Sequence, residues 1–332
     1  MWRGEFTMSS PKVVVIGATG AHGREIIKGL LESPTKFDIN TISRKASVDK
    51  PQNAALREKG VKVFGVDMLG PREELVNVLR GADAVVAPID FDNFEEQKAL
   101  VDACKEAGVK RLTPSNFAPV MPAYNVMGMR ETKEATINYI KEQRVPYTII
   151  DVAWWYQNLP FKIPSGRTDY MSEILNDDAR IIGTGDVPIA FSNLRSIGTH
   201  VARILADPRT INKYVHIWDE VLTMHQVVET LEEVSGEKVE RVYNTQKDME
   251  ETMAKCKAKL AADPKDQDAG MELTVTQYFY SMGVRGDSTP EVADYLGYLD
   301  SRRLYPDIKA STLREYYKTV LEGKEANPYA SS

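Results

Sequence analysis

The sequence predicts an α/β fold: a doubly wound parallel sheet with a smaller, mainly helical lobe. Two observations carry this prediction. Strand-like and helix-like segments alternate from residue 13 to residue 150, and a glycine-rich turn, Gly17–Gly23, joins the first strand to the first helix. Because such alternation connects parallel strands through helices, we expect the first 150 residues to form a Rossmann-type sheet.

The first strand and the first helix are the clearest elements. The run Val13–Ile16 is apolar and β-branched throughout, as in a strand that is covered on both faces. Residues 24–31 carry a helical apolar period. The remaining strands are expected at 37–42, 61–67, 82–87, 109–114 and 145–150, and the remaining helices at 53–59, 71–79, 93–107 and 130–143.

The pattern changes after residue 150. Residues 154–190 carry aromatic residues, prolines and glycines with little periodicity, which predicts loops of the kind that hold ligands. A returning strand is expected at 213–218. Residues 245–260 and 292–321 are predicted to be mostly helical.

Composition excludes several classes of protein. The 332 residues are 42% hydrophobic and 27% charged, which suits one large globular core with an appended lobe. A net charge of −6 offers no basic field for nucleic acid, and no run reaches the ~18 apolar residues of a membrane span. Cys104 and Cys256 have neither metal nor redox spacing. We therefore expect unpaired thiols in a cytoplasmic protein.

The glycine-rich turn predicts a dinucleotide site. Glycines at 17, 20 and 23 let backbone N–H groups and the helix N-terminus approach a pyrophosphate. A GxxGxxG pattern alone is weak, because glycines also punctuate ordinary turns, but here it lies between a buried strand and an amphipathic helix. The expected cofactor-binding residues in this turn are Gly17, Thr19, Gly20, His22 and Gly23.

The end of the second strand decides which dinucleotide is expected. Ser43, Arg44 and Lys45 stand where an NAD site favours an acidic residue on the ribose hydroxyls. An arginine can bind a 2′-phosphate through two hydrogen bonds, and a lysine adds a point charge. The three residues therefore favour NADPH, with an ordinary solvated basic loop as the alternative.

The same observations suggest how the chain is divided. We expect an NADP(H)-binding domain at 8–157 and a substrate lobe at 158–332, interleaved with it through the strand near 213–218. Residues 1–7 resemble no signal peptide and are interpreted as an added, non-native segment.

The order of several motifs makes the chain similar to a known family. It resembles the isoflavone-reductase-like branch of the NmrA-like, atypical short-chain dehydrogenases, together with phenylcoumaran benzylic ether and pinoresinol reductases. The resemblance covers nearly everything after Met8 and points to a fungal-type member. The motifs that carry it are Gly17–Gly23, Thr113–Phe117, Val145–Thr148, Ser196–Gly198 and Leu304–Asp307.

The resemblance implies that Lys133 is the catalytic lysine, by its distance before Val145–Thr148. Ordinary short-chain dehydrogenases place a tyrosine four residues before that lysine, whereas this chain has Met129. The lysine itself would then transfer the proton, or orient a group that does. The alternative is a solvated lysine on a charged helix.

Further site residues follow from the resemblance. Asn116 stands where the plant reductases usually carry glutamate, and Trp155 where they carry a phenylalanine that stacks on nicotinamide. Ordinary packing is the alternative for both. The other expected cofactor-binding residues are Asp67, Met68, Ala87, Pro88, Ile89 and Phe117, and the expected substrate-binding residues are Trp154, Asn158, Phe161 and Tyr278. The four histidines lack metal-ligand spacing, so no metal is expected.

These residues predict an NADPH-dependent oxidoreductase that reduces a small aromatic or polyketide-like secondary metabolite. Two alternatives stay open. NmrA-like relatives include proteins that bind NADP(H) without turnover and signal to a partner, and a retained cofactor can also serve a net isomerisation or dehydration. The expected partner is a small aromatic substrate, with no nucleic acid and no membrane, and a homodimer is left open.

Overall fold

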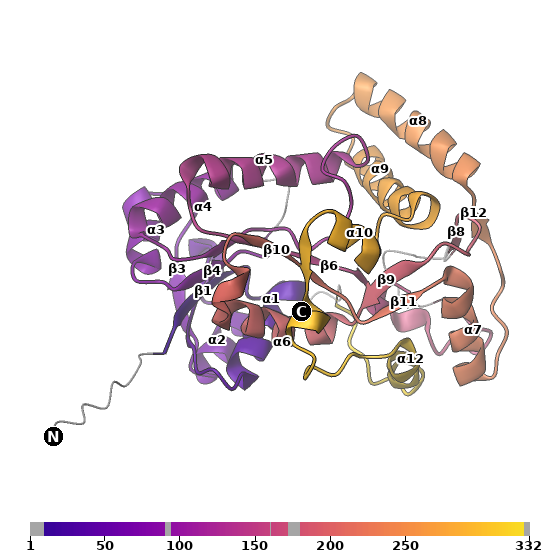
Figure 1. The fold of residues 1–332 in the computed structure, drawn as a ribbon, viewed down its shortest axis with the longest axis horizontal. Helices are drawn as coiled ribbons and strands as arrows, with labels where there is room; N and C mark the ends of the chain where they lie inside the picture. Colours follow the sequence, from indigo (N-terminus) through magenta and orange to yellow (C-terminus); the bar gives the residue numbers. More distant parts are fainter. Residues whose placement is uncertain (1–9, 90–93, 160, 172–179, 329–332) are drawn as a thin grey trace. The chain divides into compact units, whose positions relative to one another are not determined.

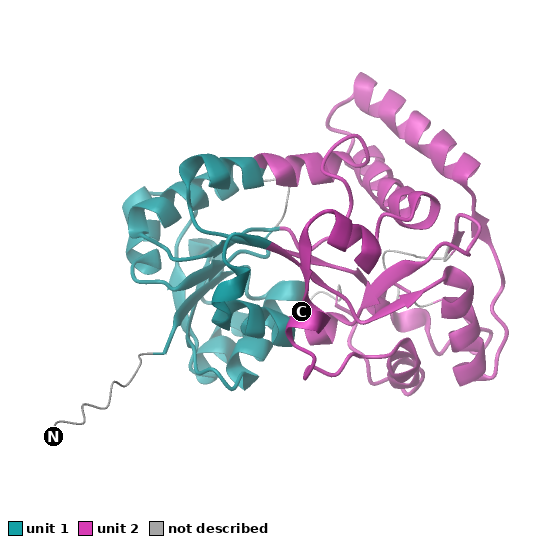
Figure 2. Ribbon diagram, viewed as in Figure 1, with its two compact units in different colours: residues 1–115, 136–149, 198–213 teal, residues 116–135, 150–197, 214–332 magenta. Residues whose placement is uncertain are grey.

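The computed structural model describes residues 10–89, 94–159, 161–171 and 180–328 (Figure 1). The predicted added segment 1–7 and the predicted helix start at Asn93 lie outside these residues. The chain forms two compact units (Figure 2). Unit 1 consists of residues 1–115, 136–149 and 198–213, and unit 2 of residues 116–135, 150–197 and 214–332. The assignment of a cofactor domain and a substrate lobe stays a prediction.

Unit 1 contains a five-stranded parallel sheet, which confirms the predicted fold class. Its strand order is β3-β2-β1-β4-β5, so the order reverses between β1 and β4. Ligands of open α/β sheets bind at such a reversal, beyond the carboxyl ends of the strands. The strands are β1 (Lys12–Ile16), β2 (Asp38–Ser43), β3 (Lys62–Gly65), β4 (Ala84–Val86) and β5 (Leu112–Thr113).

The helices predicted between these strands are present. They are α1 (Ala21–Glu32), α2 (Pro51–Glu58), α3 (Arg72–Leu79), α4 (Phe94–Ala107) and α5 (Gly128–Gln143), with a short 3₁₀ turn, η1, at Lys45–Ser47. The apolar faces of α3, α4 and α5 form one core with the sheet, in which Val14, Val85 and Leu79 are completely buried. The residues of α5 are shared between the two units.

The sixth predicted strand, β6 (Thr148–Val152), belongs to a second sheet of order β13-β10-β6. Its partners are β10 (Lys213–Ile217), the predicted returning strand, and β13 (Tyr298–Asp300). A single parallel bridge, Leu112 to Tyr147, connects β5 with the segment before β6. The segment 292–321, predicted to be mostly helical, also contains β13, because a three-residue strand is too short to carry a period of its own.

The remaining elements of the chain are short strands and helices. The strands are β7 (Trp154–Trp155), β8 (Ile181–Ile182), β9 (Ile189–Ser192), β11 (Glu220–Leu222) and β12 (Tyr243–Asn244). The helices are α6 (Leu194–Ala206), α7 (Met224–Ser235), α8 (Gln246–Ala262), α9 (Gln267–Tyr280), α10 (Pro290–Tyr295), α11 (Ser301–Leu304) and α12 (Leu313–Leu321). Single turns occur at η2 (Tyr156–Asn158), η3 (Asp169–Met171), η5 (Pro208–Thr210) and the π-turn η6 (Ser281–Arg285).

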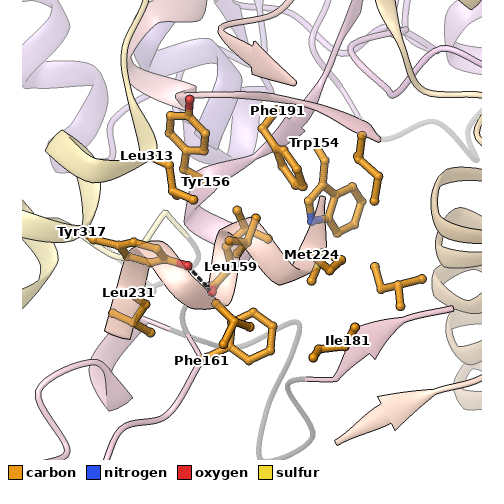
Figure 3. Close-up of a cluster of buried hydrophobic side chains, with 14 of the residues drawn as sticks. Trp154, Tyr156, Leu159, Phe161, Ile181, Phe191, Met224, Leu231, Leu313 and Tyr317 are labelled. Atoms are coloured by element: carbon orange, nitrogen blue, oxygen red, sulfur yellow. Dashed lines mark hydrogen bonds between the residues drawn. The ribbon is translucent and has the colours of Figure 1, made fainter. Parts of the chain in front are cut away.

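Unit 2 has an apolar core of its own, drawn in Figure 3. Residues from the predicted loop region 154–190 form much of it, including Trp154, Tyr156 and Phe161. The hydroxyl of Tyr317 donates to the carbonyl of Leu159 at 3.1 Å, which satisfies a polar group inside this core. The region predicted as loops therefore contains short strands and core side chains.

Over the described ranges, no helix combines the length and the hydropathy of a membrane span.

Candidate functional site

The glycine turn in unit 1 is built for a close backbone approach. Gly17 has a φ of +86°, and a Cβ there would lie 2.8 Å from the carbonyl oxygen of Pro88. A Cβ on Gly23 would lie 2.0 Å from the carbonyl oxygen of Gly17. Both positions therefore require glycine for the turn to fold.

Gly20 differs from its two neighbours in the motif. Its φ is −72°, and the nearest atom to an added Cβ is the Gly17 carbonyl oxygen at 3.4 Å, an ordinary contact. It is the N-cap of α1, and no side chain caps that helix end. The space over Gly20 and the uncapped N–H groups fit a pyrophosphate. Thr19 and His22 flank this space along the chain.

The residues predicted for the 2′-phosphate follow the end of β2. Arg44 is exposed, and within the described part of the chain it has no ion pair. Lys45 is engaged: its Nζ lies 2.7 Å from Glu74, and its backbone N–H donates to Asp67 at 3.0 Å. The hydroxyl of Ser43 accepts a hydrogen bond from Asn53 at 3.0 Å. Arg44 is thus the cation that is available for a phosphate.

The other predicted cofactor residues of unit 1 follow β3 and β4. Asp67 accepts the N–H of Gly70 and so closes a turn after β3. Met68 packs against the core of unit 1. Pro88 and Ile89 follow the buried Ala87 after β4, and the Ser115 hydroxyl donates to the Ile89 carbonyl. Because the strands are parallel, all these segments lie along one edge of the sheet.

Lys133, in unit 2, is buried rather than solvated. Only 5% of its surface is exposed, and its Nζ donates to the backbone carbonyl of Asn116 at 2.8 Å. Burial lowers the pKa of this lysine from 10.5 to about 7, and the positive charge of Arg130 acts in the same direction. The negative charge of Asp151 opposes the shift. An amine with such a pKa can accept or give a proton near neutral pH.

A buried polar cluster surrounds this contact. Asp151, on β6, accepts hydrogen bonds from Asn116 Nδ2 at 2.5 Å, from Arg130 at 2.6 Å and from the Tyr298 hydroxyl at 2.5 Å. Arg130 also pairs with Glu134 at 2.7 Å. The sequence did not predict a role for Asp151, Arg130 or Tyr298. Arg130 and Tyr298 are 168 residues apart in the chain, and no motif spacing links the three residues. The signal that remained was Asp151 itself, a carboxylate inside an apolar strand pattern.

An aromatic group lies beside the helix face that carries Lys133. The hydroxyl of Tyr278 donates to the sulfur of Met129 at 3.7 Å, and the N–H of Gly128 donates to Gln277 at 3.2 Å. Met129 and Lys133 are four residues apart on α5 and so share a face. Trp154 contacts Tyr278 with ring centroids 5.5 Å apart. Tyr278 of α9 therefore contacts Met129, one helical turn before Lys133.

The remaining predicted site residues are buried or half-buried within unit 2. Phe161 is completely buried in the core of unit 2, among the side chains of Figure 3. Asn158 is buried in η2, and Trp155 is half-buried in β7. Phe117 is buried, with a φ of +37°.

Two tyrosine–lysine pairs elsewhere in the chain have the four-residue spacing of ordinary short-chain dehydrogenases, whereas Lys133 has Met129 in the place of the tyrosine. Both lysines are on the surface: Lys247, after Tyr243, is 83% exposed and Lys309, after Tyr305, is 84% exposed. Each is paired with a glutamate of its own segment. Lys133 is the only lysine that is buried in the part of the chain that the structure describes. Among the described residues, no group of three His, Cys, Asp or Glu could hold a metal.

Comparison with known proteins decides the family. The model of the NmrA-like family matches residues 9–317. The chain belongs to the NmrA-like family. This confirms the resemblance predicted from the motifs of the sequence.

Relatives of this NmrA-like chain are named as dehydrogenases and reductases. It is 34% identical to asnovolin J 5',6'-dehydrogenase of Aspergillus novofumigatus, over 96% of this chain and 98% of the relative. It is 26% identical to phenylcoumaran benzylic ether reductase Pyrc5 of Pyrus communis, over 93% and 98%. The solved complex of AtPrR2 with NADP+ and (+)pinoresinol is 25% identical, with a TM-score of 0.74 over 94% of this chain and 99% of that one.

These relatives agree with two predictions. The predicted enzyme class, an oxidoreductase, matches the names of both curated relatives. The predicted cofactor, NADPH, matches the NADP+ of the solved complex.

Proposed function

We propose that this NmrA-like protein is an NADP(H)-dependent oxidoreductase of a small aromatic or polyketide-like secondary metabolite, with Lys133 as its proton-transfer group. The observation that carries the proposal is the state of Lys133. Its amine is buried and donates a hydrogen bond to the backbone carbonyl of Asn116 at 2.8 Å, and burial lowers its pKa to about 7. General acid–base catalysis is most effective when the pKa of the group lies near the working pH.

The residues of unit 1 fit the cofactor. Gly17, Gly20 and Gly23 leave the backbone open at the N-terminus of α1, and Arg44 offers an exposed guanidinium directly after β2. When NADPH is bound, its nicotinamide supplies a hydride. The protein has to supply the proton, which is the part we assign to Lys133.

The substrate class rests on aromatic surface and on the relatives. Trp154 and Tyr278 offer ring faces beside the helix that carries Lys133, and flat ligands bind such faces well. The names of the relatives include a benzylic ether, pinoresinol and asnovolin J, which are the compound types we would test first. One relative is named a dehydrogenase and another a reductase, so the proposal covers both oxidation of a substrate by NADP+ and its reduction by NADPH.

We place the enzyme in the cytoplasm. Both cysteines, Cys104 and Cys256, are free and buried. Unpaired thiols persist in a reducing compartment.

Two substitutions at Lys133 test the proposal. Lys133→Met should lower kcat by about two to four orders of magnitude, the usual contribution of a positioned acid or base. Its affinity for NADPH should stay within about threefold of wild type, because the proposed phosphate contacts lie elsewhere. Lys133→Arg, whose guanidinium keeps its proton, should be nearly as inactive. The assay follows NADPH oxidation and NADP+ reduction by absorbance, with phenolic ketones, enones, benzylic ethers and asnovolin J as substrates.

The outcomes separate the alternatives. A Lys133→Met variant with the wild-type rate would remove the lysine from the mechanism. A wild type that binds NADPH but turns over no substrate would favour a redox sensor. Conversion of a substrate with no net change in NADPH would favour an isomerase or a dehydratase.

A further inference from the structure

The carboxylate of Asp151 is the centre of the buried cluster beside Lys133. It has no exposed surface, and it accepts hydrogen bonds from an amide, a guanidinium and a phenol. A buried carboxylate is costly unless it is paired and hydrogen-bonded. Each of its three donors comes from a different segment: Asn116 from the loop after β5, Arg130 from α5 and Tyr298 from β13.

Asn116 links this carboxylate to the lysine. Its side-chain amide donates to Asp151, while its backbone carbonyl accepts from Lys133 Nζ. The next residue, Phe117, has a φ of +37°, a conformation that a bulky residue adopts only when its surroundings hold it. The N–H of Phe117 donates to the Ile150 carbonyl at 2.8 Å. Two neighbouring residues of one strand, Ile150 and Asp151, therefore fix the direction of the Asn116 carbonyl.

The charge around Lys133 also depends on Asp151. Arg130 on its own helix and Asp151 on β6 act on Lys133 directly. These two charges are in turn bonded to Glu134 and to Tyr298 on β13, and the buried His216 on β10 feels the charge of Asp151. Arg130 disfavours the ammonium form of Lys133, and Asp151 favours it. Loss of the Asp151 charge would leave the arginine opposed by Glu134 alone.

We propose that Asp151 is a positioning residue of the active site, which holds the Asn116 carbonyl against the Lys133 amine and balances the charge of Arg130. This proposal rests on the proposed function, because Lys133 is the proton-transfer group there. Asp151 acts through Asn116 and Arg130.

The test measures the amine directly. Lysine labelled with ¹³C at Cε is incorporated into the full chain, and the signal absent from Lys133→Arg is assigned to Lys133. Its titration midpoint is then followed by NMR in wild type and in Asp151→Asn. We expect the midpoint to fall by about one unit or more, because a favourable charge near the amine is removed. The low-pH limb of kcat/KM should move to lower pH by the same amount.

A matched control and a second variant keep the test decisive. Asp287 is a buried carboxylate of the same unit, bonded to Ser281 and Arg285, and Asp287→Asn should leave the Lys133 midpoint unchanged. Asn116→Ala removes the amide link and keeps the charges, so its midpoint should fall by about half a unit. It should also lower kcat by about tenfold or more.

Each result supports or overturns the proposal. A Lys133 midpoint that stays at the wild-type value in Asp151→Asn would overturn it. If that variant does not fold, an unchanged midpoint in Asn116→Ala would overturn it. A shifted midpoint in a protein that turns over no substrate would support Asp151 as the residue that positions the amine, and would contradict the proposed function alone.

Discussion

At the scale of single residues, burial sets the chemistry of unit 2. Lys133 and His216 are both enclosed, and burial lowers the pKa of each, to about 7 and about 4. The sequence suggested a charged, solvated helix around Lys133 as the alternative, since its neighbours are Arg130, Glu131 and Glu134. The structure instead pairs Arg130 with Glu134 inside the protein, so the charges of this helix neutralise each other.

His216 makes stability depend on pH. Both of its ring nitrogens lack a hydrogen-bond partner among the described residues, and its pKa of about 4 lies below the value of 6.5 for a solvated histidine. Between these two values the unfolded chain binds more protons than the folded one. The contribution of the neutral His216 to the free energy of unfolding is therefore fully present above pH 6.5. As the pH falls toward 4, the free energy of unfolding decreases by about 3 kcal/mol through this residue.

The substitution His216→Phe should remove this dependence. Denaturant unfolding of wild type and variant, repeated at several pH values from 4 to 8, gives the difference in free energy of unfolding at each pH. The difference should change by about 3 kcal/mol across that window. A partly exposed histidine, His225, serves as the control, and His225→Gln should leave the dependence in place. Parallel curves for wild type and His216→Phe would contradict the assignment.

At the scale of elements, close backbone contacts decide which glycines are needed. Gly198 of α6 shows this most clearly: a Cβ there would lie 1.8 Å from the Glu25 carbonyl oxygen of α1. The Ser196–Gly198 motif has no role in the proposed chemistry. Its last residue, Gly198, instead allows α6 to pack closely against α1 within unit 1. Nothing in the spacing of the motif pointed to this contact.

Gly20 and Gly23 should behave differently when substituted. Gly23→Ala forces a Cβ to 2.0 Å from the Gly17 carbonyl, so we expect it to destabilise the protein by about 2–4 kcal/mol or to prevent folding. Gly20→Val meets no such contact, and the unliganded protein should fold normally. Its NADPH affinity should fall at least about a hundredfold, since the side chain fills the pyrophosphate space.

Circular dichroism and a fluorescence titration with NADPH check both expectations. Tight NADPH binding by Gly20→Val would show that this turn is not the phosphate site. A stable Gly23→Ala protein would show that the turn can open without loss of the fold.

At the scale of the whole molecule, cofactor binding should appear as stability. A ligand that binds only the folded state raises the melting temperature in proportion to the logarithm of its concentration over Kd. Because Arg44 is the available cation after β2, NADPH should stabilise wild type more than NADH does at equal concentration. Arg44→Ala should abolish this difference, with a loss of about 1.5–3 kcal/mol in NADPH binding.

Thermal unfolding with each cofactor measures this effect without any substrate. Lys59→Ala removes another exposed cation of unit 1 and should leave the preference for NADPH intact. Equal losses of NADPH and NADH binding in Arg44→Ala would contradict its role at the 2′-phosphate.

The sequence by itself determined the local parts of this protein. Strands and helices up to residue 150 followed from apolar periodicity, and the turn at Gly17–Gly23 followed from its position between two such elements. Each of these signals lies within a few consecutive residues. The family followed from the order of motifs along the chain, which is also a property of sequence alone.

Tertiary structure alone decided the surroundings of Lys133. Its carbonyl partner comes from Asn116, the carboxylate of the cluster from β6 and the phenol from β13, a strand of three residues that no periodicity reveals. Burial and pairing of charges depend on contacts between residues up to 168 positions apart. Whether Lys133 is a solvated surface residue or a buried amine that can exchange a proton is therefore fixed by the folded chain and not by its own neighbours in sequence.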